Sequence, residues 1–407
     1  MSAAPLAGLL VVDLTRHLPG PLAARLLADL GARRIKVEEP ELGDPVRQAP
    51  PLRDGRSALA ALLLSGAESV ALDLKREGGR RVLGALLARA DCLLESFRPG
   101  VLARLGFAPE ELRRRYPRLV IASLSGFGQE GPAAGRAGHD LTYQAVAGLL
   151  RPGLGMPGLP AADLLGAWSA FSAVLAALYE RERTGQGAWL DASLLDGAVH
   201  GNLVRWAEAA AGPAPAGAGD LAGDLPCYNL YRARGGELVA LALLEPKFWR
   251  RFCDRCGRRD LRRLQFRREP PARRQVADLI ASRPAGEWAR LFAAEDLPAE
   301  VVPGPPHGKN GAEGAEGAGA PQVPPQVAAR AIVRTGAEGL PRLAFPVRFD
   351  GERPGGGGEL PRLGGSTRAW LAELGDPMSG AGRLARVRTG IGRRWSWRSL
   401  LWRFTSG

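Results

Sequence analysis

A short stretch near the start of the chain, Leu9–Thr15 (LLVVDLT), decides the fold class. It is a brief apolar run rich in valine, which is typical of a buried strand. In Pro21–Gly31 the apolar residues recur at helical spacing, and the glycine ends the predicted helix. Arg34–Glu38 then reads as a second strand. The order strand, helix, strand predicts a parallel pair joined by a crossover helix.

The same alternation continues to about residue 200. Further strands are predicted at Ser69–Leu74, Cys92–Phe97, Leu119–Leu124 and Trp189–Leu194, and helices at Glu77–Ala90, Pro109–Tyr116 and Asp163–Thr184. The sequence therefore predicts an α/β protein with a parallel sheet. Such sheets bind ligands beyond the carboxyl ends of their strands. The loops there are residues 15–20, 39–47, 98–100 and 125–140.

Changes in composition suggest how the chain is divided. We expect a large α/β domain over 1–210, a linker of Ala, Gly and Pro over 211–225, a smaller mixed domain over 226–303, a flexible Gly/Pro-rich loop over 304–326, a segment of ordinary composition over 327–376 and a basic Trp/Arg tail over 377–407. In the smaller domain, Gly235-Gly236 between Tyr228–Arg234 and Glu237–Leu244 predicts a β-hairpin. Helices are predicted near Pro246–Cys256 and at Ala285–Ala294.

Composition also excludes several classes of protein. Apolar residues make up 45% of the 407, which excludes a disordered chain, and four cysteines do not make a disulfide framework. We see no signal peptide and no apolar run near the roughly 18–20 residues that a membrane span needs, so a cytoplasmic protein is expected. The net charge is +13, but seven arginines lie in 377–407. We therefore do not expect nucleic-acid binding as the main function.

Several blocks, in order, resemble one known family. They are VVDLTRHLPGPLAARLLADLGARRIKVEEP (11–40), GDPVR (43–47), ALDLK (71–75), ESFRPGVLARLGF (95–107), SLSGFGQEGP (123–132) and RERTGQGAWLDASLLDG (181–197). Together they are similar to the family III CoA-transferase and α-methylacyl-CoA racemase superfamily (CaiB/BaiF-like). The resemblance implies a Rossmann-like large domain built from both chain ends, so that residues 327–376 return to the large domain. It also implies a small domain between the two parts and an interlocked homodimer. It also implies an acyl-CoA substrate, with coenzyme A as part of that substrate, no permanently bound cofactor and no metal.

The resemblance also points to catalytic residues. The block AGHDLTYQAVAGLL (137–150) resembles the racemase block around a catalytic histidine and assigns that role to His139. LPAADLLGAW (159–168) places Asp163 at the aspartate common to both branches. ALLEPKFW (242–249) places Glu245 where racemases carry a glutamate that orients the histidine, and Asp140 is a second candidate for that role. Because Asp163 is predicted to open a helix, free backbone N–H groups near it are expected to stabilise an enolate.

Two chemistries remain open at this site. A racemase needs one group to remove the α-proton of a thioester and another to return it on the opposite face, and His139 with Asp163 could do this. A transferase would use Asp163 as a nucleophile that forms a mixed anhydride, and would need no histidine. Thr142 stands where racemases usually have Asn, and the bulky residues 164–168 (LLGAW) resemble the transferase branch.

The phosphates of coenzyme A call for cations on the loops at the strand ends. The family blocks make Lys36 and Arg98 the first candidates, followed by Lys75, Arg47 and Arg16.

Other motifs are set aside. Residues 153–158 (GLGMPG) fit a dinucleotide fingerprint but do not follow a strand. The pair Cys253 and Cys256 has no second pair to complete a zinc site. His17, His200 and His307 show no evident partners.

Overall fold

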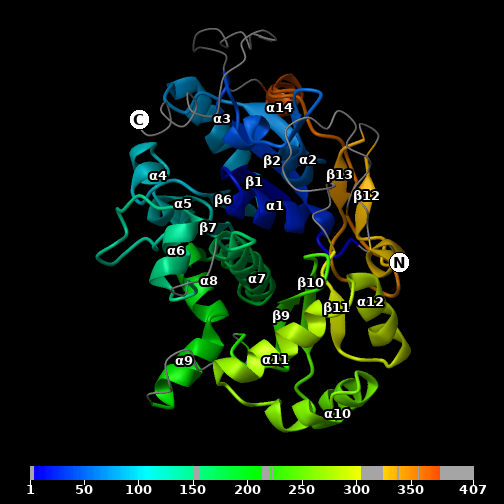
Figure 1. The fold of residues 1–407 in the computed structure, drawn as a ribbon. Helices are drawn as coiled ribbons and strands as arrows, with labels where there is room; N and C mark the ends of the chain where they lie inside the picture. The colour runs from blue at the N-terminus through cyan, green and yellow to red at the C-terminus, as the bar shows by residue number, and fades with distance from the viewer. Residues whose placement is uncertain are drawn as a thin grey trace. The chain divides into compact units, whose positions relative to one another are not determined.

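The computed structural model describes residues 4–150, 156–212, 221, 223–303, 324–336, 339–355 and 357–375. The predicted tail over 377–407 and most of the predicted loop over 304–326 lie outside these residues. The described chain forms two compact units. One comprises the residues up to Asn202 together with those from Arg330 onward, and the other is Leu203–Ala329 (Figure 1).

The first unit contains a six-stranded sheet in which every neighbouring pair is parallel, as predicted. The strand order is β5-β2-β1-β6-β7-β8. The strands are β1 (Leu10–Leu14), β2 (Arg33–Glu38), β5 (Glu68–Ala71), β6 (Cys92–Glu95), β7 (Val120–Ser125) and β8 (Trp189–Ser193). All six were predicted, and the observed bounds differ by a few residues at most.

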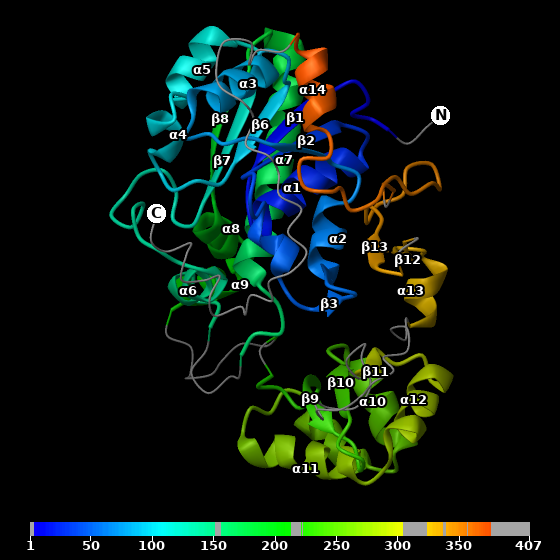
Figure 2. The same cartoon turned by 90° about the horizontal axis from the view of Figure 1, so that it is seen from above.

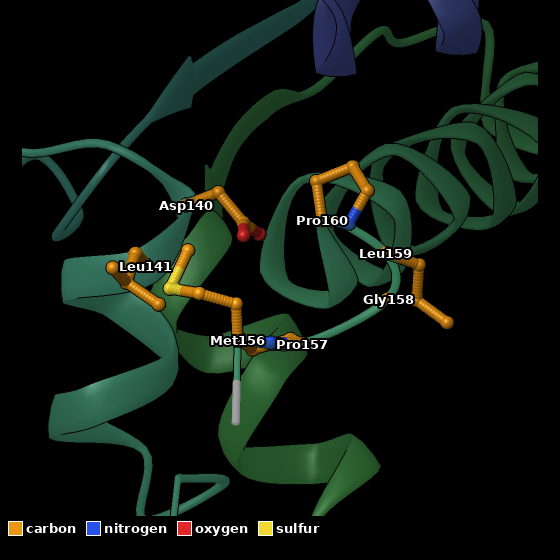
Figure 3. Close-up of a pocket in the computed structure, with 7 residues that line it drawn as sticks. All are labelled: Asp140, Leu141, Met156, Pro157, Gly158, Leu159 and Pro160. Carbon is orange, nitrogen blue, oxygen red and sulfur yellow. The ribbon is translucent and has the colours of Figure 1, made fainter. Parts of the chain in front are cut away.

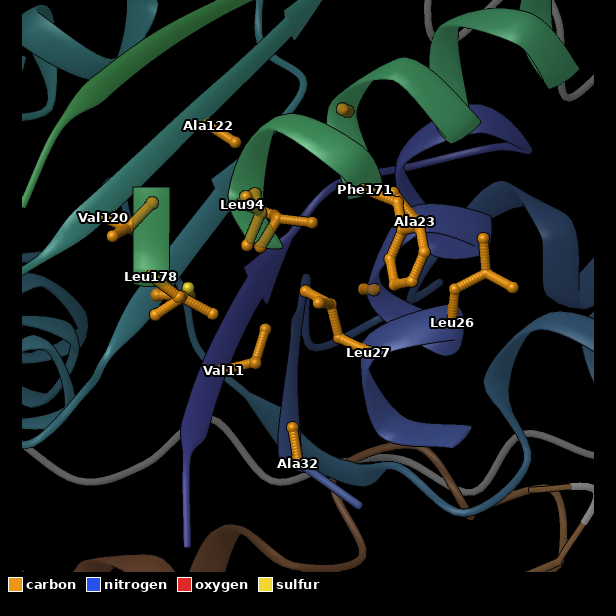
Figure 4. Close-up of a cluster of buried hydrophobic side chains, with 14 of the residues drawn as sticks. Val11, Ala23, Leu26, Leu27, Ala32, Leu94, Val120, Ala122, Phe171 and Leu178 are labelled. Carbon is orange, nitrogen blue, oxygen red and sulfur yellow. The ribbon is translucent and has the colours of Figure 1, made fainter. Parts of the chain in front are cut away.

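Helices cover both faces of this sheet (Figure 2). The helices up to residue 202 are α1 (Pro19–Asp29), α2 (Ala58–Leu64), α3 (Glu77–Leu87), α4 (Val101–Arg104), α5 (Pro109–Arg115), α6 (Asp140–Val146), α7 (Ala161–Thr184) and α8 (Leu194–Gly201). The smaller elements are the 3-10 turn η1 (Pro45–Gln48) and the hairpin of β3 (Leu52–Arg53) and β4 (Arg56–Ser57). Side chains of α1 and α7, such as Leu27 and Phe171, pack on one face of the sheet against Val11 and Val120 (Figure 4). Helices α3, α4 and α5 pack on the other face.

Helix α7 bears on the expectation that no segment of the chain spans a membrane. By length and composition it is apolar enough to cross a membrane. Within the first unit, however, Phe171 and Leu178 are buried in the core, and near its end Arg181 lies 3.0 Å from the carboxylate of Asp91. The helix is therefore explained as a core helix of this unit.

The end of the described chain completes the first unit. It contains β12 (Val333–Thr335), paired with β13 (Pro341–Leu343), and α14 (Thr367–Glu373). Trp370 on α14 is buried, donates a hydrogen bond of 2.8 Å to Glu68 and lies under the guanidinium of Arg33. Residues from both ends of the sequence thus share one core.

The second unit has its own core, centred on buried Trp249 and Trp288. The predicted hairpin is present as β9 (Tyr228–Arg232) and β10 (Leu238–Ala242), which pair antiparallel. A third strand, β11 (Ala299–Val301), was not predicted. The helices are α9 (Leu203–Ala210), α10 (Pro246–Arg255), η2 (Arg259–Leu264), α11 (Pro270–Ala281), α12 (Ala285–Ala294) and α13 (Pro325–Ala329).

Candidate functional site

The strand order locates a ligand crevice in the first unit. In chain order the six parallel strands are arranged 3-2-1-4-5-6, so the connections leave β1 and β6 in opposite directions. Ligands of such sheets bind outside the carboxyl ends of the two strands at this switch point. The backbone N–H of Arg16, after β1, donates to the hydroxyl of Ser96, after β6, over 2.9 Å. This bond joins the two loops that border the crevice.

Two of the predicted CoA-binding cations lie on these loops. Arg16 follows β1 and is half-buried, whereas Arg98 follows β6 and is exposed. Their role in binding the phosphates of coenzyme A stays a prediction. Lys75 is also exposed, but it follows β5, two strands away from β1. Neighbouring strands are about 4.8 Å apart, so Lys75 belongs to a more distant part of the same edge.

Lys36 is placed differently from the prediction. Its side chain is 1% exposed, and its ammonium lies 3.0 Å from Asp44 and 3.6 Å from Asp13. It also donates to the backbone carbonyl of Thr15. The ammonium of Lys36 is therefore paired inside the first unit, where it stabilises the loop after β1. It does not present its charge to solvent.

Arg47 is likewise engaged within the fold. Its guanidinium donates two hydrogen bonds, of 2.6 and 2.7 Å, to the buried carboxylate of Glu38, and a third to the carbonyl of Pro361. Burial acts to raise the pKa of Glu38, but Arg47 and its other cationic and hydrogen-bonding neighbours outweigh burial, so the pKa is lowered. Arg47 thus ties the return segment to the sheet, a role the sequence did not reveal.

The two principal catalytic candidates lie at the beginnings of adjacent helices. His139 is exposed at the N-terminal boundary of α6, and its backbone N–H and carbonyl both bond to the hydroxyl of Thr142. Asp163 lies in the first turn of α7. Between them, Asp140 joins the helices through its carboxylate. The local structure thus brings together segments that are 24 positions apart in the sequence.

Asp140 has a different role from the predicted one. Its Oδ1 accepts the backbone N–H groups of Ala162 and Asp163 over 2.9 and 3.1 Å, and its Oδ2 accepts from the side chain of Gln144 over 2.6 Å. The carboxylate therefore caps the start of α7, and the bond to His139 that we expected is not among these. For the same reason, the two N–H groups expected to be free for an enolate are already bonded.

The surroundings of Asp163 change its acidity. Burial raises its pKa to about 7, and the negative charge of Asp140 acts in the same direction. At neutral pH the side chain is therefore divided between its protonated and ionised forms. A carboxyl group in this state can both accept and donate a proton.

Tyr143 joins this site and was missed in the sequence. It is buried on α6, and burial raises its pKa to about 12, with Asp163 acting in the same direction and Arg98 opposing it. A Cβ on Gly126 would lie 2.3 Å from the tyrosine hydroxyl, so only glycine leaves room for this ring. In the sequence, the available clue was a tyrosine four residues after His139, one helical turn away.

His17 also lies in this region. It follows β1 with a left-handed backbone, φ of 69°, and its N–H donates to Asp44 over 3.1 Å. Desolvation lowers its pKa, the charge of Asp44 opposes this, and the neighbouring His139 lowers it further. The histidine that seemed to lack partners therefore lies near the predicted catalytic histidine.

Glu245 belongs to the second unit. It directly precedes α10, and its backbone carbonyl accepts the N–H groups of Phe248 and Trp249. Its side chain is exposed. Its predicted role in orienting His139 stays a prediction.

A shallow hollow lies beside the catalytic candidates. Its volume is about 190 Å³, and it is lined by Asp140 and Leu141 of α6 and by Met156–Pro160. Figure 3 shows the side chain of Met156 extending toward Leu141, with Asp140 on the neighbouring side. The hollow offers an apolar surface directly next to the cap of α7.

The motifs set aside gain no support. Cys253 is buried in the second unit, and burial raises its pKa to about 12, which keeps it a neutral thiol. Across the described ranges, no group of three or more His, Cys, Asp or Glu side chains could hold a metal ion. Most of the glycine-rich motif over 153–158 lies outside the described residues.

The family and the fold are shown by comparison with known proteins. A family model described as CoA-transferase family III matches residues 6–367. The chain belongs to this family. It is therefore an enzyme homologous both to CoA-transferases and to α-methylacyl-CoA racemases, and the family acts on CoA thioesters.

Relatives from both branches of the family are similar to the chain. Acetyl-CoA:oxalate CoA-transferase of Acetobacter aceti is 32% identical over 374 residues, covering 86% of this chain and 92% of that enzyme. Human α-methylacyl-CoA racemase is 33% identical over 304 residues, covering 72% and 76%. A CaiB/BaiF family protein from Brucella suis has a crystal structure with a TM-score of 0.76 and 27% identity, covering 92% of this chain and 100% of that one. The fold and the family are shared, while the two branches differ in reaction.

Proposed function

We propose that this family III enzyme catalyses α-proton exchange on a 2-methylacyl-CoA thioester, as an α-methylacyl-CoA racemase does. The observation that carries the proposal is the pair of adjacent helix starts. Asp163, with a pKa of about 7, lies in the first turn of α7, and His139 directly precedes α6. Asp140 joins the two helices. Two groups that can exchange protons near neutral pH are what inversion of an α-carbon needs.

The reaction requires two proton transfers. One group removes the α-proton as the C–H bond breaks, and the electron pair moves into the thioester to form an enolate. The other group, which carries a proton, returns it to the opposite face of the α-carbon. Asp163 is suited to either step because it is partly protonated, and the imidazole of His139 provides the complementary acid or base. Arg16 and Arg98 bind the phosphates of coenzyme A at the switch point.

Solvent isotope exchange tests this proposal. In D₂O the enzyme should incorporate deuterium at the α-position of 2-methylacyl-CoA, and His139→Ala or Asp163→Ala should slow the incorporation by about 10²- to 10⁴-fold. Mass spectrometry of the recovered thioester measures it. If the unaltered enzyme incorporates no deuterium at saturating concentration, the proposal is wrong.

A second candidate is CoA transfer between carboxylates, favoured by the long match to an acetyl-CoA:oxalate CoA-transferase. Here the carboxylate of Asp163 attacks the thioester carbonyl, the C–S bond breaks and CoA leaves as a thiolate, which leaves a mixed anhydride on the enzyme. Attack requires the ionised carboxylate, and a pKa of about 7 leaves much of Asp163 protonated at neutral pH. For this reason we place it second.

Trapping distinguishes the two reactions. Under the transferase mechanism, hydroxylamine added with acyl-CoA should label Asp163, and His139→Ala should keep its activity. Incubation in D₂O with and without a free carboxylate acceptor gives a second comparison, because transfer depends on the acceptor whereas α-proton exchange does not.

The proposal includes a homodimer, as the family resemblance implies, and a location in the cytoplasm, as expected from the sequence pattern. Helix α9 supports the dimer because it exposes Leu203 and Trp206 by 60% and 56%. Exposed apolar side chains that lie together commonly mark interfaces. Light scattering of the purified protein should give twice the chain mass of 43.1 kDa.

A further inference from the structure

One segment of the second unit carries far more positive than negative charge. Residues 246–274, which run from α10 into α11, contain twelve Lys and Arg against three Asp and Glu, a net charge of +9. The aspartates neutralise only part of it, because Asp254 pairs with Arg262 and Asp260 lies 2.8 Å from Arg258. A positive excess of this size attracts anionic surfaces.

The arginines are most concentrated in residues 262–268 (RRLQFRR), which we name the arginine turn. All four arginines of the turn are exposed. Within the part of the chain that the structure describes, Arg263 and Arg267 form no salt bridge. Their charges are therefore available to an anion outside the protein.

The turn also exposes an aromatic ring. Phe266 lies at its centre and is 54% exposed. The preceding residue, Gln265, is buried, and its amide donates to the carbonyls of Leu243 and Leu244 over 3.0 and 2.8 Å. Because Gln265 is fixed on the inner side of the turn, Phe266 stays on the outer side between the arginines.

Both ends of the turn are fixed to the fold. The indole N–H of buried Trp249 is shared between the carbonyls of Leu261 and Arg262, over 3.2 and 3.1 Å. At the other end, the guanidinium of Arg273 donates to the carbonyl of Arg268 over 2.7 Å. The exposed ring and its flanking charges are therefore displayed by an anchored turn.

We propose that the arginine turn docks the enzyme on the surface of a membrane that contains anionic phospholipids, with Phe266 inserted among the headgroups. Arginine binds phosphate through its charge and its paired N–H donors. An apolar side chain next to such cations adds the burial that holds a protein at the membrane interface. This docking does not depend on which reaction the enzyme catalyses.

The single exposed ring favours a membrane over a nucleic acid strand. Proteins that bind single strands stack successive bases on several aromatic side chains along a groove. Among the described residues of 246–274, Phe266 is the one exposed aromatic side chain, since Trp249 and Phe252 are buried and Phe248 is half-buried. One ring that projects from a turn suits a continuous surface better than a strand of bases.

Vesicle sedimentation with the full chain tests the proposal. The unaltered enzyme should bind vesicles of mixed phosphatidylcholine and phosphatidylglycerol at least about tenfold more tightly than vesicles of phosphatidylcholine alone, and added salt should weaken this binding. The double variant Arg263→Gln with Arg267→Gln should weaken it by about tenfold or more, because each cation at an anionic surface contributes about fivefold.

Substitution of the ring tests insertion separately from charge. Phe266→Ser should weaken binding to the mixed vesicles by about tenfold, because the apolar burial of a phenyl ring is lost. Phe266→Trp should keep the affinity, since tryptophan also prefers the membrane interface.

Two variants serve as matched controls. Arg113→Gln with Arg183→Gln removes the same charge from exposed positions on α5 and α7, and should keep the affinity within about twofold. Leu230→Ser removes a side chain that is 57% exposed on β9, and should have as little effect. The tail over 377–407 is the same in every variant, so it does not contribute to the differences.

Three results would overturn the inference. The first is equal binding of the unaltered enzyme to both kinds of vesicle, and the second is an equal loss of binding in the control variants. The third is a change of mass in light scattering for Phe266→Ser, which would place the ring in a contact between copies of the chain. If the substitutions in the turn weaken binding of a single-stranded oligonucleotide but not of vesicles, the partner is a nucleic acid and the membrane proposal is wrong.

Discussion

At the scale of single residues, surroundings decide what a carboxyl group can do in this enzyme. Asp13 is fully buried, and the charges of Lys36 and Arg34 outweigh burial, so its pKa is lowered. Among the described residues, no positive charge lowers the pKa of Asp163 in this way. Burial and the negative charge of Asp140 both raise it, to about 7. The same side-chain type thus serves as an ion-pair partner at one position and as a candidate proton carrier at another.

Asp163→Asn should stabilise the first unit at alkaline pH. The folded pKa of about 7 exceeds the ordinary value of 3.8, so the folded state keeps a proton that the unfolded chain releases. In the unaltered enzyme, stability from this group therefore falls as pH rises from about 4 to 7. Asparagine cannot ionise, and the variant should gain about 2 to 4 kcal/mol at pH 8 and little at pH 4.

Denaturant unfolding at the two pH values measures this effect. Asp196→Asn, which changes an exposed carboxylate on α8, serves as the control and should show no such pH-dependent gain. An equal gain for Asp163→Asn at both pH values would mean that the raised pKa is not its cause.

At the scale of elements, the start of α7 depends on a distant segment. The sequence predicted that Asp163 begins this helix, but α7 begins at Ala161 and places Asp163 in its first turn. The cap comes from Asp140, 22 residues before Ala162 in the chain. Sequence rules for helix caps consider only residues next to the helix start, so they could not identify Asp140 as the cap.

Substitutions of Asp140 should separate capping from charge. Asp140→Ala removes both the acceptor and the charge, and should cost about 1 to 2 kcal/mol of stability. Asp140→Asn keeps an acceptor oxygen and should preserve most of that stability. Both should lower the pKa of Asp163, because its negative neighbour is gone.

Carbon-13 NMR titration of the Asp163 carboxyl measures the change in its pKa, and denaturant unfolding measures the change in stability. If Asp140→Asn destabilises as much as Asp140→Ala, the hydrogen bonds from Ala162 and Asp163 do not cap the helix as described.

The predicted elements show where local patterns suffice. Helix Ala285–Ala294 was predicted with its observed bounds, and the hairpin around Gly235-Gly236 is present. Eight described helices were not predicted, namely α2, α4, α6, α8, α9, α11, α13 and α14, and α2 and α11 illustrate why. The first is short, and the second begins with two prolines in an arginine-rich stretch, so neither offers a clear apolar period.

At the scale of the whole molecule, one core draws on both ends of the sequence. Trp370 lies about 300 positions after Glu68, to which its indole donates, and it is 1% exposed. Arg47 adds a second link through the carbonyl of Pro361. The return segment is therefore part of the first unit and not an appendage to it.

Trp370→Ala should lower the stability of the first unit by about 3 to 5 kcal/mol, as expected for removal of a buried tryptophan. The second unit has its own core around Trp249 and Trp288 and should keep its stability. Hydrogen exchange followed by mass spectrometry measures both units in one protein. Loss of protection confined to α14 would contradict a shared core.

The sequence by itself determined the parallel α/β architecture, the six strands of its sheet, the helices α1, α3, α5, α7, α10 and α12, and the family to which the chain belongs. The architecture and the elements follow from local periodicity, and the family follows from ordered blocks of residues. Both kinds of pattern can be read directly from the sequence. Only the tertiary structure decided that Lys36 and Arg47 are held in internal ion pairs, that Asp140 caps α7, and that Tyr143 and His17 lie near the candidate site. Burial and charge act through space between residues distant in sequence, so the acidity of Asp163 emerges only when the chain is folded.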